Sequence, residues 1–542
     1  MQKVEEFLAK YYLLIILVLA IPAIWALFVP GFYGASDDLH VAWLFQMDSV
    51  IKMLKFPPRF VPDLSFGFGY PLFNFVFPLP FYVGEIFHLL SLTFVDSVKA
   101  VFLISIPLSM FFMYKLLKNF SSSVLSLAGA AVYAFTPYRS TDIYVRGDIG
   151  ESLSFVFLPI IILSIVKLSK KEKVGGRWIG ILGLSTGALI LTHNIIAYMF
   201  MPFALLLLII SGRVLKSLWG IALGLIISAF FWVPAISESH LMKYDTVFNF
   251  IDHFPTLKQL ITPYFGYGAS VPGPYDGMSF YMGTVNILLI VGGTIAFFFL
   301  RKRFELRLKV LFVWLLSIVV ISIFMMNFRS TFVWQTIPLL LYFQFPWRFL
   351  TMITFASSIF VVFLEKFKFG KYIGLAIILA AVGLNFSYFR PHDFLGRTDA
   401  YYLNRYIPVP VASPEYLKTG EEYLRLSVAT LTRPDKNYPL IVANLGTVYN
   451  IQYLNRLDSK FEVQSNKDVS IDYNKYLFPG WVVKVNGKKV SINAGKPFGQ
   501  ITFNVPSGVH SIEVAFNETP FRAVFDLVSL LGLAVAVTII FI

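Results

Sequence analysis

The sequence contains no cysteine. This absence excludes disulfide bonds and every metal or redox site that depends on a thiolate. Charged residues are also scarce: they make up 14% of the 542 residues, whereas a soluble globular protein carries roughly 25%. Apolar residues take their place, at 57% of the chain with a mean hydropathy of +0.70. The composition therefore excludes an ordinary soluble domain.

Long apolar runs are the main feature that is present. Runs of about 18–22 residues cross the hydrocarbon core of a bilayer, and their recurrence predicts a polytopic α-helical membrane protein with about twelve transmembrane helices. The predicted spans are 12–31, 98–114, 121–137, 150–166, 178–193, 195–211, 217–235, 281–300, 310–327, 349–364, 372–389 and 521–542. The first run lacks a small-residue cleavage site, so we expect a membrane helix there instead of a cleaved signal peptide.

One further apolar segment, 69–90, is interrupted by prolines. It contains Pro71, Pro78 and Pro80, together with the ionisable residues Glu85 and His88. Proline breaks a helix, and irregular backbone does not face lipid in the hydrocarbon core. The segment is therefore predicted to be re-entrant or interfacial and not a full span.

The charge of the loops predicts the topology. If the N-terminus lies in the cytoplasm, the loops on its side carry nineteen Lys and Arg residues and five Glu residues, a difference equal to the +14 of the whole chain. This distribution satisfies the positive-inside rule. The basic balance is thus a sign of topology and not of nucleic-acid binding.

The opposite, outer side holds a long first loop, 32–97, and a less apolar region, 390–520. The latter shows strand-like alternation in "WVVKVNGKKVSI" and "ITFNVPSGVHSIEVAF", and Asn486-Gly487 is a hairpin-turn signal. We predict a membrane domain over 1–389, an extracytoplasmic β-sandwich over 390–520 and a closing helix over 521–542. The last residues, "AVTIIFI", have no polar flank, which is the pattern expected of a truncated chain.

The first polar motif on the outer side is "SDDLH", residues 36–40. Asp37 and Asp38 follow the first span directly, and acidic residues suit a helix N-terminus with Ser36 as the N-cap. The motif fits either a cap of an interfacial helix or part of a site.

The second motif is "PYRSTDIYVRGDIGES", residues 137–152. It brings Arg139, Asp142, Arg146, Asp148 and Glu151 into one short loop. A helix that starts here places the last two acids on one face. Surface ion pairs are one explanation, but a dense ionisable cluster at a membrane boundary favours a functional site.

Two more motifs carry single candidates. His193 interrupts an apolar stretch in "LTHNI", where it belongs either to a tight hairpin turn or to a site. Arg348 follows Pro346 and Trp347 at the outer start of a span. It either extends its charge to the interface or holds a phosphate.

Carboxylates and arginines at one membrane boundary suit sugar transfer from a polyprenyl-phosphate donor. A carboxylate deprotonates the acceptor hydroxyl or orients a metal, and arginines hold the leaving phosphate. We assign the donor phosphate to Arg146 and Arg348, with Arg139, His40 and His193 as further substrate-binding candidates. The polyprenyl tail would lie among the membrane helices, next to membrane lipids.

At these residues the chain resembles the GT-C superfamily of polyprenyl-phosphate-dependent glycosyltransferases. More narrowly, it resembles the bacterial and archaeal membrane proteins labelled "6-pyruvoyl-tetrahydropterin synthase-related" and the YfhO-type family. The matching segments are 56–83, 144–160, 191–195, 345–350 and 477–516.

The resemblance implies an inverting transferase in a prokaryotic plasma membrane, with a cytoplasmic N-terminus and an extracytoplasmic active site. The essential acid after the first span would be Asp37, with Asp38 as the alternative. Asp148, with Glu151 nearby, corresponds to the second acidic motif that, together with Asp37, holds a divalent cation such as Mg²⁺ or Mn²⁺ in the oligosaccharyltransferase branch. Branches that use a single-phosphate donor often need no metal. The acceptor would be a glycan, a lipid or a protein.

Two other classes of function fit a multi-span chain. A transporter or flippase of cell-envelope glycan precursors would show repeats and polar groups near the midplane, whereas here the ionisable residues gather at one face. A non-catalytic scaffold that binds glycan through the outer β region is the third possibility.

Overall fold

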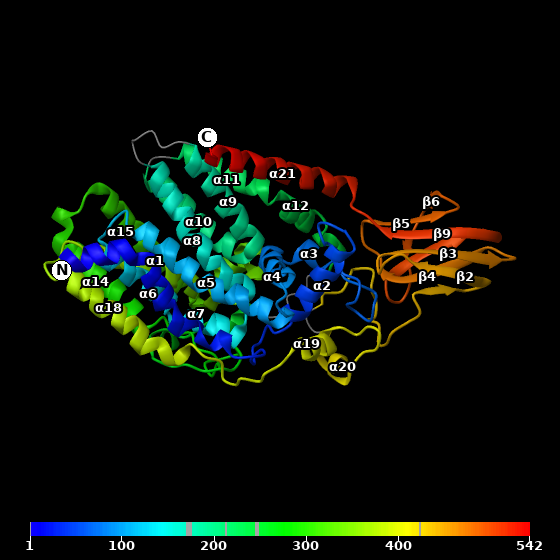
Figure 1. Ribbon diagram of the computed structural model, residues 1–542, viewed down its shortest axis with the longest axis horizontal. Coiled ribbons are helices and arrows are strands. Elements are labelled where there is room, and N and C mark those ends of the chain that lie inside the picture. Colours follow the sequence, from blue (N-terminus) through cyan, green and yellow to red (C-terminus); the bar gives the residue numbers. More distant parts are fainter. Residues whose placement is uncertain (1, 170–175, 212–213, 244–248, 422–423, 542) are drawn as a thin grey trace.

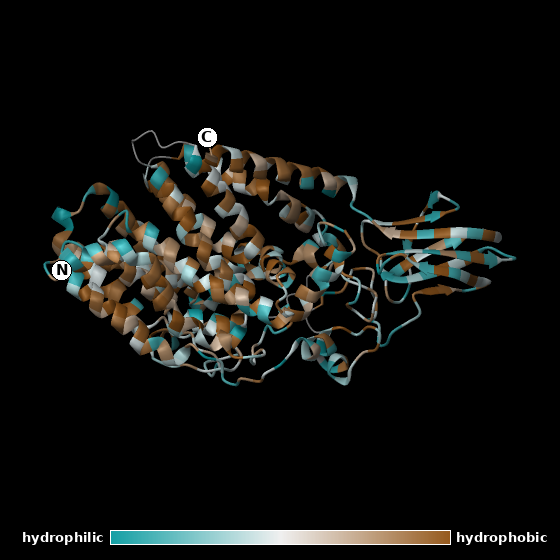
Figure 2. Cartoon of the chain, viewed as in Figure 1, coloured by the Kyte–Doolittle hydropathy of each residue, from teal (hydrophilic) through white to brown (hydrophobic). Residues whose placement is uncertain are grey.

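A computed structural model of the chain describes residues 2–169, 176–211, 214–243, 249–421 and 424–541. Helices form the body of the molecule, and two β-sheets project from one end (Figure 1). The apolar residues are concentrated in the helical body, while the sheets alternate between apolar and polar residues (Figure 2). This confirms a polytopic helical membrane protein with a C-terminal β region.

Nine helical segments of the described ranges are long and apolar enough to cross a membrane. They are α1 with the turn after it (Gln2–Phe28), α5 (Phe94–Leu117), α8 (Ile149–Leu168), α10 (Asn194–Ser211), α14 with the turn after it (Thr284–Arg303), α15 (Leu306–Met325), α17 with its flanking turns (Pro346–Leu364), α18 with the turn after it (Gly370–Tyr388) and α21 (Pro520–Phe541). A tenth would be the pair α11 (Leu215–Ile227) and α12 (Ala229–Ser237), which is bent by 66°.

The remaining two predicted spans fall on shorter helices. α6 (Ser123–Ala134) has 12 residues and α9 (Arg177–Thr192) has 16. At 1.5 Å per residue, a helix of 12 residues covers about 18 Å of a hydrocarbon core that is about 30 Å thick. Twelve predicted spans therefore correspond to helices, but nine or ten of them meet the length of a full crossing.

The segment 69–90 contains only short helices, α3 (Leu72–Phe75) and α4 (Leu79–Leu89). Together with α2 (His40–Lys52), these helices build the first loop. Ile86 and Leu89 on α4 and Leu90 directly after it are exposed, as expected for a helix that lies against lipid at the interface.

Loops predicted to share the side of the N-terminus meet in the structure. Glu5 accepts hydrogen bonds from the backbone N–H groups of Ser123 and Val124. Its carboxylate lies 4.0 Å from the Lys118 ammonium and 3.9 Å from the Lys371 ammonium. Of the charges counted for this side, Lys170, Lys171, Glu172, Lys173 and Arg213 lie outside the described residues.

The C-terminal strands form two antiparallel sheets. One sheet has the order β1-β4-β8-β7 and the other β2-β3-β9-β5-β6. The strands are β1 (Ile441–Ala443), β2 (Thr447–Tyr453), β3 (Asp458–Ser465), β4 (Val469–Tyr476), β5 (Trp481–Val485), β6 (Lys488–Val490), β7 (Asn493–Ala494), β8 (Gln500–Val505) and β9 (Gly508–Phe516). Asn486 and Gly487 have φ values of 48° and 80° and join β5 to β6, so the predicted hairpin turn is confirmed.

Before these strands, the described residues from 390 to 440 form isolated β-bridges at Arg397 and Ser427 but no strand. Residues 399–419 contain two short helices, α19 (Asp399–Tyr406) and α20 (Pro414–Thr419). The sheets pack on the first loop, where the Phe60 ring lies edge-on to Trp481 and beside Phe516. The first loop therefore lies between the helical body and the sheets.

Candidate functional site

The backbone of Asp37 joins the first loop to the second polar motif. The Asp37 N–H donates to the Arg146 carbonyl at 2.7 Å, and the Ser36 N–H donates to the Val145 carbonyl at 3.0 Å. The helix α2 begins only at His40, with Leu39 at its N-cap, so the expectation that Ser36 caps it is wrong. Asp37 and Asp38 lie in the turn before α2, and neither residue is its N-cap.

The second motif folds as a tight turn into α8. A π-helical turn over Thr141–Arg146 ends at Gly147, whose φ of 73° suits a glycine. Asp148 then caps α8, because its Oδ1 accepts a hydrogen bond from the Glu151 N–H at 2.8 Å. This turn points the two acids and Arg146 toward one another.

Arg146 is held by three carboxylates. Its Nη1 lies 2.8 Å from Asp142 and 2.7 Å from Glu151, and its Nη2 lies 2.7 Å from Asp148. The guanidinium also faces the Trp347 ring at 4.8 Å. All of these charged groups are buried, so the cluster is stabilised by pairing and not by water.

Arg348 approaches the same acids from the start of α17. It lies 3.9 Å from Asp148 and 3.8 Å from Glu151, which is beyond hydrogen-bond distance. Its Nη1 donates to the Phe343 carbonyl at 3.3 Å, while its buried Nε has no hydrogen-bond partner among the described residues. Arg348 thus retains donor capacity that Arg146 has already used.

His193 lies between α9 and α10, as predicted for a break in the apolar stretch. Its Nδ1 accepts a hydrogen bond from the Ile196 N–H at 3.2 Å, so in the neutral ring the proton is on Nε2. That nitrogen faces Asp148 at 3.6 Å. Burial opposes ionisation of Asp148, but Arg146 and His193 hold the pKa of its carboxyl well below the usual range.

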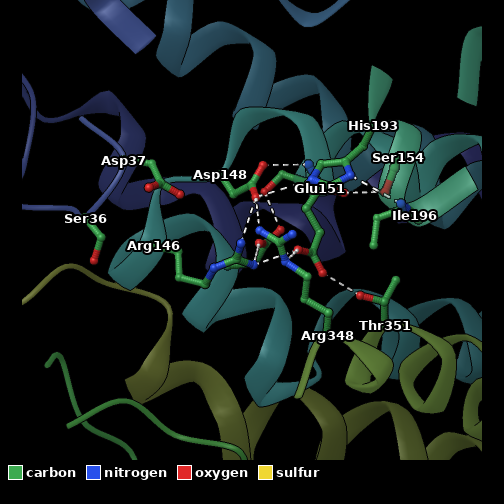
Figure 3. Close-up of polar contacts among 12 residues, drawn as sticks. Ser36, Asp37, Arg146, Asp148, Glu151, Ser154, His193, Ile196, Arg348 and Thr351 are labelled. Atoms are coloured by element: carbon green, nitrogen blue, oxygen red, sulfur yellow. Dashed lines mark hydrogen bonds and ion pairs between the residues drawn. The ribbon is translucent and has the colours of Figure 1, made fainter. Parts of the chain in front are cut away.

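The Asp37 side chain lies at the edge of this cluster, as Figure 3 shows. It is half-buried, and no hydrogen bond or ion pair joins its carboxylate to any residue in the described ranges. Burial and the charge of Asp148 raise the pKa of Asp37 to about 7, despite the nearby Arg146 and Arg348. A carboxyl with this pKa exchanges protons near neutral pH.

Asp38 has a different environment. It is 4% exposed, accepts a hydrogen bond from the Tyr406 hydroxyl and lies 3.6 Å from the Arg397 guanidinium. Its contacts attach α19 to the first loop. Of the two neighbouring aspartates, only Asp37 faces the cluster of Arg146, Asp148 and Glu151.

Two of the predicted substrate-binding residues contact the cluster less directly. His40 donates from Nδ1 to the Asp37 carbonyl at 2.7 Å, and burial lowers its pKa to about 4. Arg139 is fully buried over the Phe155 ring at 4.1 Å. None of its guanidinium nitrogens has a hydrogen-bond partner within the part of the chain that is described.

Asp148, Glu151 and His193 offer ligand atoms within 4.8 Å of one another, so this buried group could hold a metal ion. Its number and types of donors are those of a divalent-cation site. Both carboxylates are, however, already paired with Arg146, which lies 2.7 Å from each. The group therefore offers the ligands of a metal site, but Arg146 supplies a positive charge to them already.

Three hydroxyl groups of the cluster, those of Tyr138, Ser152 and Thr351, were not assigned a role from the sequence. The Tyr138 and Thr351 hydroxyls each donate to Glu151 at 2.6 Å, and Asp142 accepts from the Ser152 hydroxyl at 2.7 Å. Thr351 follows Arg348 by one turn of α17, and this spacing is the sequence signal that could have identified it.

Comparisons with known proteins agree with the predicted resemblance. Residues 76–237 match the family described as "Dolichyl-phosphate-mannose-protein mannosyltransferase". This segment contains the second motif and His193, and the match confirms the resemblance to GT-C membrane glycosyltransferases.

Individual relatives are distant. The chain is 24% identical over 257 residues to an uncharacterized protein of Lactococcus lactis subsp. cremoris (strain MG1363), which covers 44% of this chain and 41% of that protein. A cryo-EM structure of the arabinofuranosyltransferase AftD from mycobacteria aligns with a TM-score of 0.44 at 12% identity, over 71% of this chain and 27% of AftD. A mutant AftD structure aligns with a TM-score of 0.43. The chain thus spans less than half the length of these relatives.

Proposed function

We propose that the protein is a membrane glycosyltransferase that moves a sugar from a polyprenyl-phosphate donor to an acceptor hydroxyl. The observation that carries the proposal is the convergence of Asp37, Asp148, Arg146 and Arg348 from three separate parts of the chain. The family match over residues 76–237 supports the same class of reaction.

In this proposal Asp37 is the general base. It takes the proton of the acceptor hydroxyl, and the hydroxyl oxygen then forms a bond to the anomeric carbon of the donor sugar. The bond from that carbon to the phosphate oxygen breaks, and the polyprenyl phosphate leaves with the electron pair. Attack opposite the leaving group inverts the anomeric configuration. The unpaired carboxylate of Asp37 supports this role more than the bonded carboxylate of Asp38 does.

Arg348 is assigned to the leaving phosphate. Its unused donors can form charge-assisted hydrogen bonds to phosphate oxygens, which strengthen as negative charge develops. The donors of Arg146 are already hydrogen-bonded to Asp142, Asp148 and Glu151. We therefore assign to Arg146 the positioning of the acids and a favourable positive charge near the phosphate.

We also propose that transfer does not depend on a bound metal. A divalent ion would supply positive charge beside Asp148 and Glu151, and Arg146 supplies that charge already at 2.7 Å. Incubation with a chelator is expected to leave the transfer rate unchanged. A loss of activity that Mg²⁺ or Mn²⁺ restores would contradict this part of the proposal.

The site is proposed to face the extracytoplasmic side of a prokaryotic plasma membrane. The positive loops support this orientation, and two of them meet near the N-terminus, where Lys118 and Lys371 face Glu5. The β region lies on the first loop, and we propose that it helps to hold a glycan, lipid or protein acceptor.

The test is sugar transfer by the full chain in proteoliposomes that contain polyprenyl-phosphate sugars. Replacing Asp37 by Asn is expected to lower the rate about 10²–10⁴-fold, since that is the range of general-base catalysis. Glu305→Gln is the control, because Glu305 and its partner Arg307 are both exposed. Unaltered transfer by Asp37→Asn would contradict the role of Asp37 as the base. If the unmodified protein transfers no sugar from any polyprenyl-phosphate donor, the proposed class of reaction is wrong.

A further inference from the structure

Four stacked rings connect the two ends of the candidate site. His40 stacks on Phe81, with ring centroids 5.7 Å apart and planes 9° apart. Phe81 stacks on Phe77 at 6.4 Å, and Phe77 stacks on His193 at 4.9 Å. We call these four rings the aromatic column. Its order in space differs from its order in the chain, since Phe81 lies between His40 and Phe77.

One end of the column contacts Asp37, and the other end faces Asp148. At one end, His40 holds the Asp37 carbonyl at 2.7 Å. At the other end, the His193 Nε2 faces Asp148 at 3.6 Å. The column therefore spans from the backbone of the proposed base to the acid that pairs with Arg146.

Phe77 and Phe81 differ in their burial and in the residues that pack against them. Phe81 is fully buried in the first loop and packs against Phe73 and Trp43. Phe77 is half-buried, and its ring lies so close to the first turn of α8 that a Cβ on Gly150 would come within 2.5 Å of it. Phe77 is thus wedged beside the turn that carries Asp148 and Glu151.

We propose that Phe77 and Phe81 are positioning residues that set the separation of Asp37 from Asp148. They act through His40 and His193, and neither needs to touch a substrate. Close-packed rings resist compression and sliding, so a flat, rigid spacer transmits position better than a flexible side chain does. The catalytic meaning of this arrangement rests on the proposed function, whereas the geometry itself can be tested without it.

The first test uses activity. Phe77→Leu and Phe77→Met remove the ring, Phe77→Tyr keeps it, and Phe75→Leu is the matched control because Phe75 faces Phe478 of the β region. Ring removal is expected to lower kcat about 10–100-fold with little change in KM for the donor, as for a displacement of about 1 Å between reacting groups. Phe77→Tyr is expected to restore kcat. Equal losses in Phe77→Tyr and Phe77→Leu, or a normal kcat in Phe77→Met, would overturn the proposal.

The second test needs no sugar transfer. Because the chain has no cysteine, spin labels can be attached uniquely at Ser36→Cys and Asn194→Cys, two exposed positions next to the ends of the column. Electron paramagnetic resonance is expected to give a narrow distance distribution that broadens in Phe77→Leu and Phe77→Met but not in Phe75→Leu. An unchanged distribution in the Phe77 variants would overturn the positioning role. Absent transfer by the unmodified protein would instead count against the proposed function.

Discussion

At the scale of single residues, the neighbours Asp37 and Asp38 differ through contacts made far along the chain. The Tyr406 hydroxyl that bonds Asp38 is 368 residues away. The Asp37 carboxylate has no such partner among the described residues, and its pKa rises to about 7 through burial and the charge of Asp148. A partnered acid anchors structure, and an unpartnered acid near neutral pKa is suited to proton transfer.

The pKa of Asp37 predicts how activity depends on pH. The base works only as a carboxylate, so kcat/KM is expected to rise with pH up to about 7 and to level off above it. Asp148 stays ionised throughout this range, because its pKa is held well below the usual value. Initial rates between mildly acidic and mildly alkaline pH measure the profile. A flat profile would contradict proton transfer to Asp37.

Arg348 provides a second prediction at this scale. Arg348→Gln is expected to lower kcat/KM about 10²–10³-fold, the usual effect of losing a donor to the developing charge. Arg348→Lys keeps the charge but not the planar pair of donors, so an intermediate loss is expected. Arg329→Gln is the control, since Arg329 is an exposed arginine that follows α15. Equal rates in Arg348→Gln and Arg329→Gln would show that Arg348 does not hold the phosphate.

At the scale of elements, the start of α8 determines the geometry of the site. Gly147 allows the sharp turn, Asp148 caps the helix, and Gly150 leaves room for neighbouring groups. A Cβ on Gly150 would lie 2.5 Å from the Phe77 ring and 2.7 Å from the Thr192 carbonyl. One helical turn therefore depends on close approach from both the first loop and α9.

Gly150→Ala tests this close packing. Overpacking usually costs about 1–3 kcal/mol, so the variant is expected to unfold at a lower temperature. Gly292→Ala in α14 is the matched control, because no atom lies within 4 Å of the added Cβ and alanine favours a helix. Thermal unfolding in detergent compares the two variants. Equal stability would show that the Phe77 ring and the α9 backbone move aside at little cost.

At the scale of the whole molecule, Arg59 of the first loop joins the loop to the region around α21. It lies 2.7 Å from Glu518 and 2.6 Å from Asp526, and it donates to the Phe230 carbonyl at 2.9 Å. Arg59 is 2% exposed. Removing one partner of a buried ion pair is costly, because the other charges remain without compensation.

Arg59→Ala is therefore expected to destabilise the protein by about 3–5 kcal/mol and to expose the segment between β9 and α21, which carries Glu518, to proteases. Lys460→Ala is the control, since Lys460 and Glu513 form an exposed pair whose loss costs about 0–1 kcal/mol. Thermal unfolding and limited proteolysis measure both effects. Equal protease sensitivity of the two variants would show that the sheets are held by other contacts.

Features of the fold that depend on local sequence pattern can be predicted from the sequence. Hydropathy locates every helix that could cross the membrane, and the Asn486-Gly487 turn follows from backbone preference alone. It does not predict that the helices α6 and α9 are short, because apolar residues also continue into their loops. Nor does it separate Asp37 from Asp38 or reveal that Arg146 is enclosed by acids, since those facts depend on contacts between distant segments.

The pairing of Arg59 with residues beyond 517 also bears on how the protein is made. The ribosome delivers the first loop early and the partners Glu518 and Asp526 more than 450 residues later. During that interval the guanidinium of Arg59 has neither carboxylate available. The contacts that join the first loop to α21 through Arg59 can thus form only after α21 has been made. Nonsense mutations ahead of residue 518 are therefore expected to leave a protein whose earlier membrane helices insert but whose Arg59 stays without its carboxylate partners.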